Sequence, residues 1–463
     1  MQRLAALLVS LVLAAPSLAA EAPAALRSEA RALFESIIAM DTSVGKHEVP
    51  AMAEFLAARF RAAGFPASDI HIVPFGDTAS LVVRYRGDGS GGRPVALLAH
   101  MDVVTAKRSD WQRDPFRLTE EAGYFYGRGT ADVKQQVALL VATFLHLKAE
   151  GFVPTRDLII AFCGDEESAQ DSTVDLVDNH HDLIDAEYAL NGDGGGGVFD
   201  DTTGKPTIYY VQGAEKSAVT FLLTTRNAGG HSSQPRADNA IYDLADAVKA
   251  VQRLGFPIQW SDWTISDLRA AGAVTPGPLG AALSRFAAKP GDRAAAREIE
   301  RSPAFVGKIR TTCVATQIEG GHAENALPQS AVATINCRVF PGTPAATVQQ
   351  AIQTAVGPHV EVAMRYVPLV SEASPLRPDL MAAVDQALKA STPGATIVPT
   401  MAVYATDGSV FRRGGIPTYG VDSTFMKRSD EFRHGLNERI QVSAFYAGLP
   451  YWDTLIRAIA SKP

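Results

Sequence analysis

The sequence predicts an α/β protein with a mainly parallel, doubly covered sheet and a smaller α+β domain inserted into it. Apolar strand-like segments alternate with helical segments up to about residue 213. The pattern then changes to strands rich in β-branched residues, and the first pattern returns after about residue 370. Strands that alternate with helices form parallel sheets covered on both faces. We therefore expect a larger domain over 21–213 and 371–463 and an inserted domain over 214–370.

Hydrophobic periodicity places the elements of the larger domain. Helical spacing runs over 30–64 and over 133–147. Short apolar runs typical of buried strands lie at 81–83, 95–99, 157–163 and 188–190. Beyond the inserted domain we expect a helix at 376–390 and strands near 397–403 and 417–421.

The inserted domain has the element order of a ferredoxin-like, split βαβ fold. The expected elements are a strand at 217–225, a helix at 238–254, strands at 309–318 and 331–340, a helix at 343–355 and a strand at 359–367. Residues 257–308 contain several Pro and Gly residues and short helical pieces, which indicates an insertion within this domain.

Composition narrows the class of protein. The 463 residues carry a formal net charge of -7 and no Lys/Arg-rich run, which argues against a nucleic-acid partner. Arg3, a short apolar run and small residues before Ala20 are typical of a signal peptide over 1–20, cleaved near Ala19 or Ala20. No later stretch is long and apolar enough for a membrane span. We expect a periplasmic or secreted protein.

Polar side chains follow two of the predicted strands. His100 and Asp102 close one strand, where positions i and i+2 share a face, so Asp102 is placed to orient the His100 imidazole. Glu166 and Glu167 follow another strand within a run of three carboxylates, which repel one another unless a cation neutralises them. A surface accident and a solvated acidic loop are the ordinary alternatives.

Three further residues belong to the same pattern. Asp132 begins a helix after a glycine-rich turn, Asp193 follows a strand beside flexible glycines, and His434 lies near the C-terminus. An N-cap, a plain turn and an isolated surface histidine are the ordinary explanations. In doubly wound sheets, however, sites form at the carboxyl ends of strands, where most of these residues fall.

Together these residues indicate a metal centre. Two imidazoles and three carboxylates are the donors that two zinc ions bridged by one carboxylate require. The five candidate ligands are His100, Asp132, Glu167, Asp193 and His434. Glu166, spare beside Glu167, is placed to accept a proton from a metal-bound water.

With these motifs in this order, the sequence resembles the M20 family of metallopeptidases, which includes carboxypeptidases, dipeptidases and aminoacylases. The resemblance implies that His100, Asp132 and Asp193 hold one zinc ion, and that Asp132, Glu167 and His434 hold the other. Asp132 is then the bridge between two Zn²⁺ ions per subunit, for which Co²⁺ or Mn²⁺ can substitute.

The resemblance also assigns roles in turnover and substrate binding. Glu166 is the general base and acid, and Asp102 orients a metal ligand. His231, in a Gly-Gly-His-Ser-Ser motif of the inserted lid or dimerisation domain, stabilises the oxyanion. Asn325 and Arg338 match substrate-binding positions of that lid. Gly414 and Gly415 resemble a backbone loop that receives the substrate carboxylate.

Two segments differ from the family pattern. Gln135-Gln136 stands where a glycine usually follows the lysine, and residues 168–171 stand where glycines often follow the two glutamates. We expect both differences to reshape the rim of the pocket. The resemblance also implies a cis peptide bond between Asp132 and Val133.

Cys313 and Cys337 are expected to be cross-strand neighbours. Counting outward from the loop at 319–330 places the two residues nearly opposite each other in a hairpin. An oxidising compartment would allow a disulfide, and two buried thiols are the alternative.

The function predicted from the sequence is that of a dinuclear zinc exopeptidase, a carboxypeptidase or dipeptidase that cleaves short peptides next to a free carboxylate. An N-acyl amino acid amidohydrolase uses the same chemistry with a different pocket. A metal-free binding protein that kept the fold is the alternative from another class. A homodimer formed through the lid domain is expected, unless the 257–308 insertion covers the lid edge.

Overall fold

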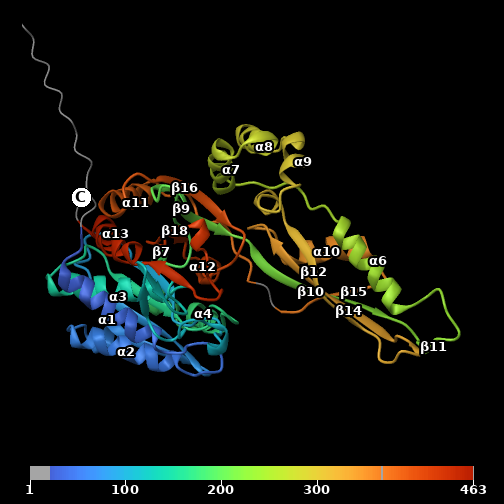
Figure 1. The fold of residues 1–463 in the computed structure, drawn as a ribbon, viewed down its shortest axis with the longest axis horizontal. Coiled ribbons are helices and arrows are strands. Elements are labelled where there is room, and N and C mark those ends of the chain that lie inside the picture. The colour runs from blue at the N-terminus through green and yellow to red at the C-terminus, as the bar shows by residue number, and fades with distance from the viewer. Residues whose placement is uncertain (1–20, 367–368, 462–463) are drawn as a thin grey trace, which may run out of the picture.

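The computed structural model describes residues 21–366 and 369–461, so the expected signal peptide over 1–20 lies outside the described residues. A ten-stranded sheet forms the core of the larger domain in the order β1-β2-β6-β3-β7-β17-β9-β8-β18, with β16 also paired to β9 (Figure 1). The strands are β1 (Ile70–Phe75), β2 (Thr78–Tyr85), β3 (Val95–His100), β6 (Leu158–Cys163), β7 (Tyr188–Asn191), β8 (Gly196–Phe199), β9 (Pro206–Glu215), β16 (Thr396–Ala402), β17 (Thr418–Gly420) and β18 (Phe425–Lys427). The central pairings from β6 through β3 and β7 to β17 are parallel, which confirms the predicted mainly parallel central sheet.

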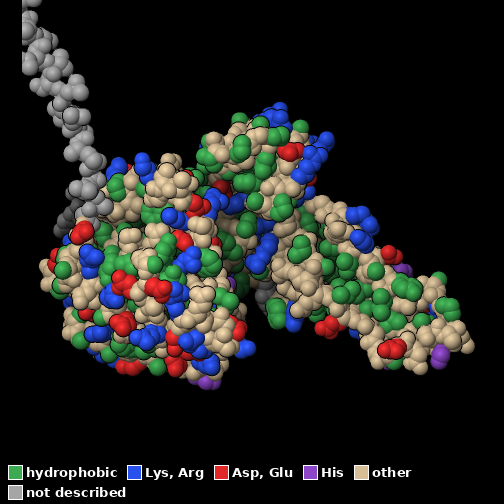
Figure 2. Space-filling view, viewed as in Figure 1, with side chains coloured by type: hydrophobic (Ala, Val, Ile, Leu, Met, Phe, Trp, Pro, Cys, Tyr) green, Lys and Arg blue, Asp and Glu red, His purple; other side chains and the backbone are tan. Residues whose placement is uncertain are grey.

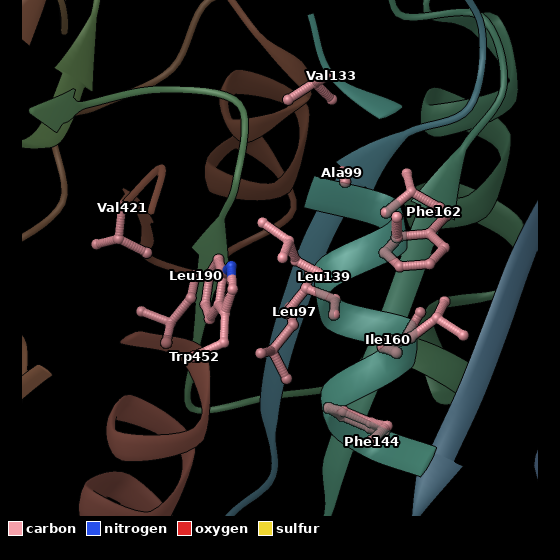
Figure 3. Close-up of a cluster of buried hydrophobic side chains, with 14 of the residues drawn as sticks. Leu97, Ala99, Val133, Leu139, Phe144, Ile160, Phe162, Leu190, Val421 and Trp452 are labelled. Carbon is pink, nitrogen blue, oxygen red and sulfur yellow. The ribbon is translucent and has the colours of Figure 1, made fainter. Parts of the chain in front are cut away.

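Helices cover both faces of this sheet. The helices of the larger domain are α1 (Ala24–Ile38), α2 (Val49–Ala62), α3 (Lys134–Ala149), α4 (Asp171–Asn179), α5 (His181–Ile184), α11 (Pro378–Ser391), α12 (Asp407–Arg413) and α13 (Val442–Ala460). Alternate residues of β3 point to opposite faces: Leu97 packs into the core beneath α3 and α13, and Leu98 packs into the core beneath α4 and α12. Figure 3 shows the first core, where Leu97 lies near Leu139 and Trp452. A strand buried on both faces explains the continuous apolar run in the sequence.

The helical pattern predicted over 30–64 forms two helices rather than one. The chain leaves α1 at Ile38 and begins α2 at Val49. Asp41 accepts hydrogen bonds from the backbone N–H and the hydroxyl of Ser43, and Gly45 has a φ of +80°. These features close a turn between the helices, because side chains such as Asp compete with helical backbone hydrogen bonding.

The smaller domain extends away from the larger one (Figure 1). Its elements are β10 (Ser217–Arg226), α6 (Ala240–Arg253), β12 (Thr312–Gly320), β14 (Ser330–Val339), α10 (Ala345–Val356) and β15 (Glu361–Met364). The four strands form an antiparallel sheet in the order β12-β14-β10-β15, and its core is separate from those of the larger domain. A two-stranded ribbon of β11 (Gly230–His231) and β13 (Ala326–Leu327) lies at its far end. Cys313 and Cys337 are register partners with Cα atoms 4.0 Å apart, as predicted, and of the two alternatives left open they form the disulfide.

Residues 257–308 form a small helical unit beside the junction of the two domains. It contains α7 (Asp262–Val274), α8 (Gly277–Ala288) and α9 (Arg293–Ile299). Trp263 of α7 is buried against the larger domain, and its indole N–H donates to the carbonyl of Ser374 at 2.8 Å. Asp267 pairs with Lys308 at 2.6 Å and accepts from the hydroxyl of Thr400 at 2.7 Å. The insertion is therefore anchored to the larger domain, and it leaves most of β12 exposed.

A short three-stranded sheet completes the larger domain. It consists of β4 (Thr119–Glu121), β5 (Tyr124–Tyr126) and β19 (Arg439–Gln441). The pairing of β19 with β5 brings the segment around residue 434 back to the turn that precedes α3. No helix among the described residues has both the length and the apolar character needed to cross a bilayer.

Candidate metal centre and active site

The side chains of three predicted ligands meet where β3 ends and α3 begins. His100 is buried at the end of β3, and its Nε2 lies 3.2 Å from Asp132 Oδ1 and 3.9 Å from Asp193 Oδ2. His100 Nδ1 lies 3.1 Å from the backbone carbonyl of Asp102, to which it donates in the tautomer that leaves Nε2 with a lone pair. Nε2 is then free to bind a cation between the two carboxylates.

A second group lies on the other side of Asp132. His434 Nε2 is 3.2 Å from Asp132 Oδ2 and 2.9 Å from Glu167 Oε1. The two carboxylate oxygens of Asp132 thus face different imidazoles, which is the arrangement of a bridging ligand. All five predicted ligands come together in two overlapping groups, although they lie far apart in the sequence.

The electrostatics of these side chains favour a cation at this site. Burial and the Asp132 charge raise the pKa of Asp193 well above its ordinary value. Burial and the Asp193 charge do the same to the pKa of Glu166. Burial alone would raise the pKa of Asp132, but hydrogen bonds with His100 and His434 outweigh burial and lower this pKa. Carboxylates gathered this closely repel one another unless protons or metal ions neutralise them.

The donor set also fits divalent metals in its geometry. Ligand atoms of His100, Asp132 and Glu167 lie within 4.8 Å of one another, and so do those of His100, Glu166 and Asp193. Imidazole nitrogen together with carboxylate oxygen suits zinc and similar ions. The residues present therefore fit two metal ions held near Asp132.

Asp102 connects the metal site to the loop that carries the two glutamates. Its carboxylate accepts the backbone N–H groups of Glu166 at 3.1 Å and Glu167 at 3.0 Å. Its backbone carbonyl accepts from His100, so one residue orients a histidine and a loop. The Asp102 carboxylate also lies 3.4 Å from His100 Nδ1, so this side chain contacts both the imidazole and the glutamate loop.

Glu438 is a residue that sequence reasoning missed. Its buried carboxylate accepts the backbone N–H groups of Ala131 at 2.7 Å and Asp132 at 3.0 Å, and it pairs with Arg128 at 2.6 Å. These bonds fix the turn that aims Asp132 at both imidazoles. The peptide bond from Asp132 to Val133 is cis, as predicted. The proximity of Glu438 to His434 in the sequence was the available signal.

A cavity of about 600 Å³ opens from the metal ligands toward the smaller domain. Figure 2 shows the hollow between the two domains, with Lys and Arg side chains on its walls. Arg338 and Ala218 of the smaller domain line the cavity, and Tyr404 and Arg433 line it from the larger domain. Arg433 contacts Glu431 at 2.7 Å, whereas no carboxylate of the described residues pairs with Arg338. Tyr404 and Arg433 are further residues that the sequence did not indicate.

Six predicted site residues do not line this cavity: His100 and Asp102 are buried at the metal site, and the other four lie elsewhere. His231 and Asn325 lie at the far end of the smaller domain, where His231 is exposed on β11 and the backbone carbonyl of Asn325 accepts from Ser232. Gly414 and Gly415 end α12, and a side chain at Gly414 would meet Val177 of α4. The structure therefore places the two glycines in the outer helical layer.

The two segments that differ from the family pattern have different positions. Ser168 and Gln170 line the cavity, so residues 168–171 do form part of its rim. Gln136 is fully buried, donates to Asp422 at 2.6 Å and accepts from Trp452 at 2.8 Å. The expectation that Gln135-Gln136 reshapes the rim is wrong, because both side chains lie in the interior behind the metal site.

Comparisons with known proteins identify the family. A model of peptidase family M20/M25/M40 matches residues 96–458, so the chain belongs to this family. The human protein named N-fatty-acyl-amino acid synthase/hydrolase PM20D1 is 28% identical over 80% of this chain and 75% of its own length. Aminoacylase-1B of Rattus norvegicus is 24% identical over 93% of this chain and 95% of its own length.

Solved structures show the same fold. An M20 family metallo-carboxypeptidase from Sulfolobus solfataricus superposes with a TM-score of 0.68 at 16% identity, over 93% of this chain and 99% of that one. Human carnosine dipeptidase 1 gives a TM-score of 0.63 at 14% identity, over 94% and 97%. At these identities the likeness establishes the fold and leaves the substrate undefined.

Proposed function

We propose that the protein is a dinuclear zinc hydrolase that cleaves an amide bond next to a free carboxylate. One observation supports this most strongly. The cavity has acidic and imidazole metal ligands on one wall and Arg338, which has no carboxylate partner among the described residues, on the other. A guanidinium binds a carboxylate through two parallel hydrogen bonds, so Arg338 is suited to the free carboxylate of a substrate.

The residues of the chain divide the chemistry between them. Zinc ions, when bound by these ligands, would supply an activated water and polarise the scissile carbonyl. Glu166, which lines the cavity beside the ligands, accepts the proton of that water and returns it to the leaving amine. Gln170 donates to Glu166 Oε1 at 3.3 Å and holds this carboxylate in the cavity.

N-acyl amino acids are the substrate class that we propose first, and short peptides come second. The relatives named as N-fatty-acyl-amino acid hydrolases and aminoacylases support the acyl class. The structural neighbours described as a carboxypeptidase and a dipeptidase support peptides. Both classes place a carboxylate close to the scissile amide, which suits a cavity lined by both Arg338 and the metal ligands.

A substrate screen tests this proposal. Zinc-loaded protein is assayed on N-acyl amino acids, on dipeptides and on the same compounds with the carboxylate converted to a carboxamide. We expect hydrolysis of the free acids, loss of activity with a chelator, and recovery when zinc is added. Arg338→Met should lose activity on the free acid. On the carboxamide, the variant and the wild type should have similar activity. Equal activity on acids and carboxamides would contradict the proposal.

We further propose that the smaller domain forms a homodimer through β12. This edge strand exposes Val314 and Ile318, and the neighbouring helix α6 exposes Ile241 and Tyr242. An exposed edge strand with apolar side chains readily pairs with a second copy. Light scattering should give a dimer for the wild type and a monomer for Ile318→Glu. A monomeric wild type at micromolar concentration would contradict this.

His231 then acts in the site of the other subunit. Its Nδ1 accepts the backbone N–H of Ser233 at 3.1 Å, so the neutral ring carries its proton on Nε2. An exposed imidazole with a fixed N–H donor is suited to stabilising an oxyanion. His231 lies far from the metal ligands of its own chain, which favours a role in trans.

We propose export from the cytoplasm as well. The apolar segment before Ala20 supports it, and so does the Cys313–Cys337 disulfide, because disulfides persist mainly in oxidising compartments. N-terminal sequencing of the protein from its source should begin near residue 20. A mature chain that begins at Met1 would contradict export by cleavage.

A further inference from the structure

A second cavity, of about 440 Å³, adjoins the metal site on the side of the larger domain. It shares Glu167 and Ser168 with the main cavity, so the two cavities meet beside a metal ligand. Its walls come from the turn between α1 and α2, from the β1–β2 hairpin, and from the segment after β3. A substrate whose scissile amide lies at the metals can therefore extend in two directions.

The charges differ between the two cavities. The main cavity has Arg338 and Arg433, whereas the residues that line the second one include no Lys or Arg. The substrate carboxylate therefore belongs in the main cavity. The other half of the substrate, beyond the scissile carbonyl, is left to occupy the second cavity.

Most of the acidic groups in the second cavity already have partners within the protein. Asp102 accepts two backbone N–H groups, and Asp165 accepts the backbone N–H of Ser172 at 2.9 Å. Asp77 pairs with His47 at 3.0 Å. These carboxylates have less need of a cationic ligand, which disfavours the ammonium group of a peptide as the occupant.

The remaining walls supply apolar contacts. Val49 and Val103 are buried, Phe75 and Val104 are half-buried, and Val44 is 71% exposed on the turn between α1 and α2. One exposed valine is ordinary on a protein surface. Here it stands at a cavity that shares the predicted ligand Glu167 with the main cavity, beside four other apolar side chains.

We propose that this second cavity binds the acyl chain of an N-acyl amino acid and makes the enzyme selective for apolar acyl groups. The inference rests on the proposed hydrolysis of N-acyl amino acids and adds the place and the preference for the acyl group. Each methylene that enters an apolar site gains about 0.8 kcal/mol, or about fourfold in kcat/KM. Activity should therefore rise with acyl length until the cavity is full.

A chain-length series with a matched pair of variants tests the proposal. The probes are acetyl, butanoyl, hexanoyl and decanoyl derivatives of one amino acid, with a dipeptide as a reference. Val44→Asp places a charge on the proposed path of the chain. Val274→Asp is the control, because Val274 is 72% exposed on α7 and lies outside both cavities. Both positions are exposed, so both variants should fold.

We expect the decanoyl-to-acetyl ratio of kcat/KM to fall about tenfold or more in Val44→Asp and to stay at the wild-type value in Val274→Asp. A flat chain-length series, or an unchanged ratio in Val44→Asp, would overturn the acyl cavity while leaving the amidohydrolase function intact. Hydrolysis of the dipeptide with no turnover of any acyl compound would overturn the proposed N-acyl substrate class itself.

Discussion

Glu438→Gln tests whether a buried carboxylate holds the bridging ligand in position. In the folded protein Glu438 accepts three backbone N–H groups of the turn that carries Asp132, and it pairs with the buried Arg128 at 2.6 Å. Glutamine has nearly the same size but no charge. The substitution therefore leaves the guanidinium of Arg128 buried without an anionic partner.

The expected cost follows from this burial. Removing one partner of a buried ion pair destabilises a protein by about 3–5 kcal/mol. Arg128 keeps weaker hydrogen bonds to the carbonyls of His434 and Gly435, both at 3.3 Å, so we expect the lower end of this range. Glu54→Gln is the matched control, because its ion pair with Arg61 is exposed to solvent and contributes little to stability.

Urea denaturation and a zinc competition assay measure the two consequences. Glu438→Gln should lower the free energy of unfolding by about 3 kcal/mol in metal-free protein. It should also weaken zinc binding about 10- to 100-fold, because Asp132 is no longer aimed by its backbone. If the stability of Glu438→Gln lies within about 1 kcal/mol of that of Glu54→Gln and zinc affinity is unchanged, Glu438 does not hold Asp132 in position.

Three further predictions concern turnover and pH. Glu166→Gln should lower kcat by about 10²- to 10⁴-fold with both zinc ions retained, whereas Glu167→Gln should lose zinc as well, as metal analysis will show. His231→Ala should lower kcat about 10²- to 10³-fold without loss of zinc, and mixing it with Glu166→Gln subunits should restore activity only if His231 acts in trans. Burial, with the charges of Arg338 and Lys308, lowers the pKa of Lys216 to about 7 from its ordinary 10.5. Between pH 7 and pH 10.5 the unfolded chain therefore binds more protons at this lysine than the folded protein does. The free energy of unfolding, measured relative to Lys216→Met, should then rise by at most about 1.4 kcal/mol per pH unit. A difference between the two proteins that does not change with pH would contradict this.

The central strands were predictable because burial on both faces leaves an unmistakable apolar run. The segments 95–99 and 157–163 correspond to β3 and β6 almost residue for residue. The turn between α1 and α2 was missed, because apolar spacing continues through a segment that Asp41 and Gly45 close into a turn. Hydrophobic periodicity indicates which residues are buried. It does not readily reveal a break between two consecutive helices.

The candidate metal ligands were predictable from residue type and from their positions after strands. The walls of the cavity were not, since Tyr404 and Arg433 become part of the site only through the return of the chain after the smaller domain. The buried Glu438 was equally hidden, because a carboxylate that accepts backbone hydrogen bonds has no spacing pattern of its own. The cross-strand position of Cys313 and Cys337 could be predicted because the register of a hairpin can be counted from its loop.

The dinuclear metal centre can be tested by anomalous diffraction at the zinc edge from crystals of zinc-loaded protein. We expect two peaks about 3.5–4 Å apart with Asp132 between them. One peak should contact His100 and Asp193, and the other Glu167 and His434. A single peak, or two peaks that Asp132 does not bridge, in protein that hydrolyses substrate would contradict the dinuclear assignment.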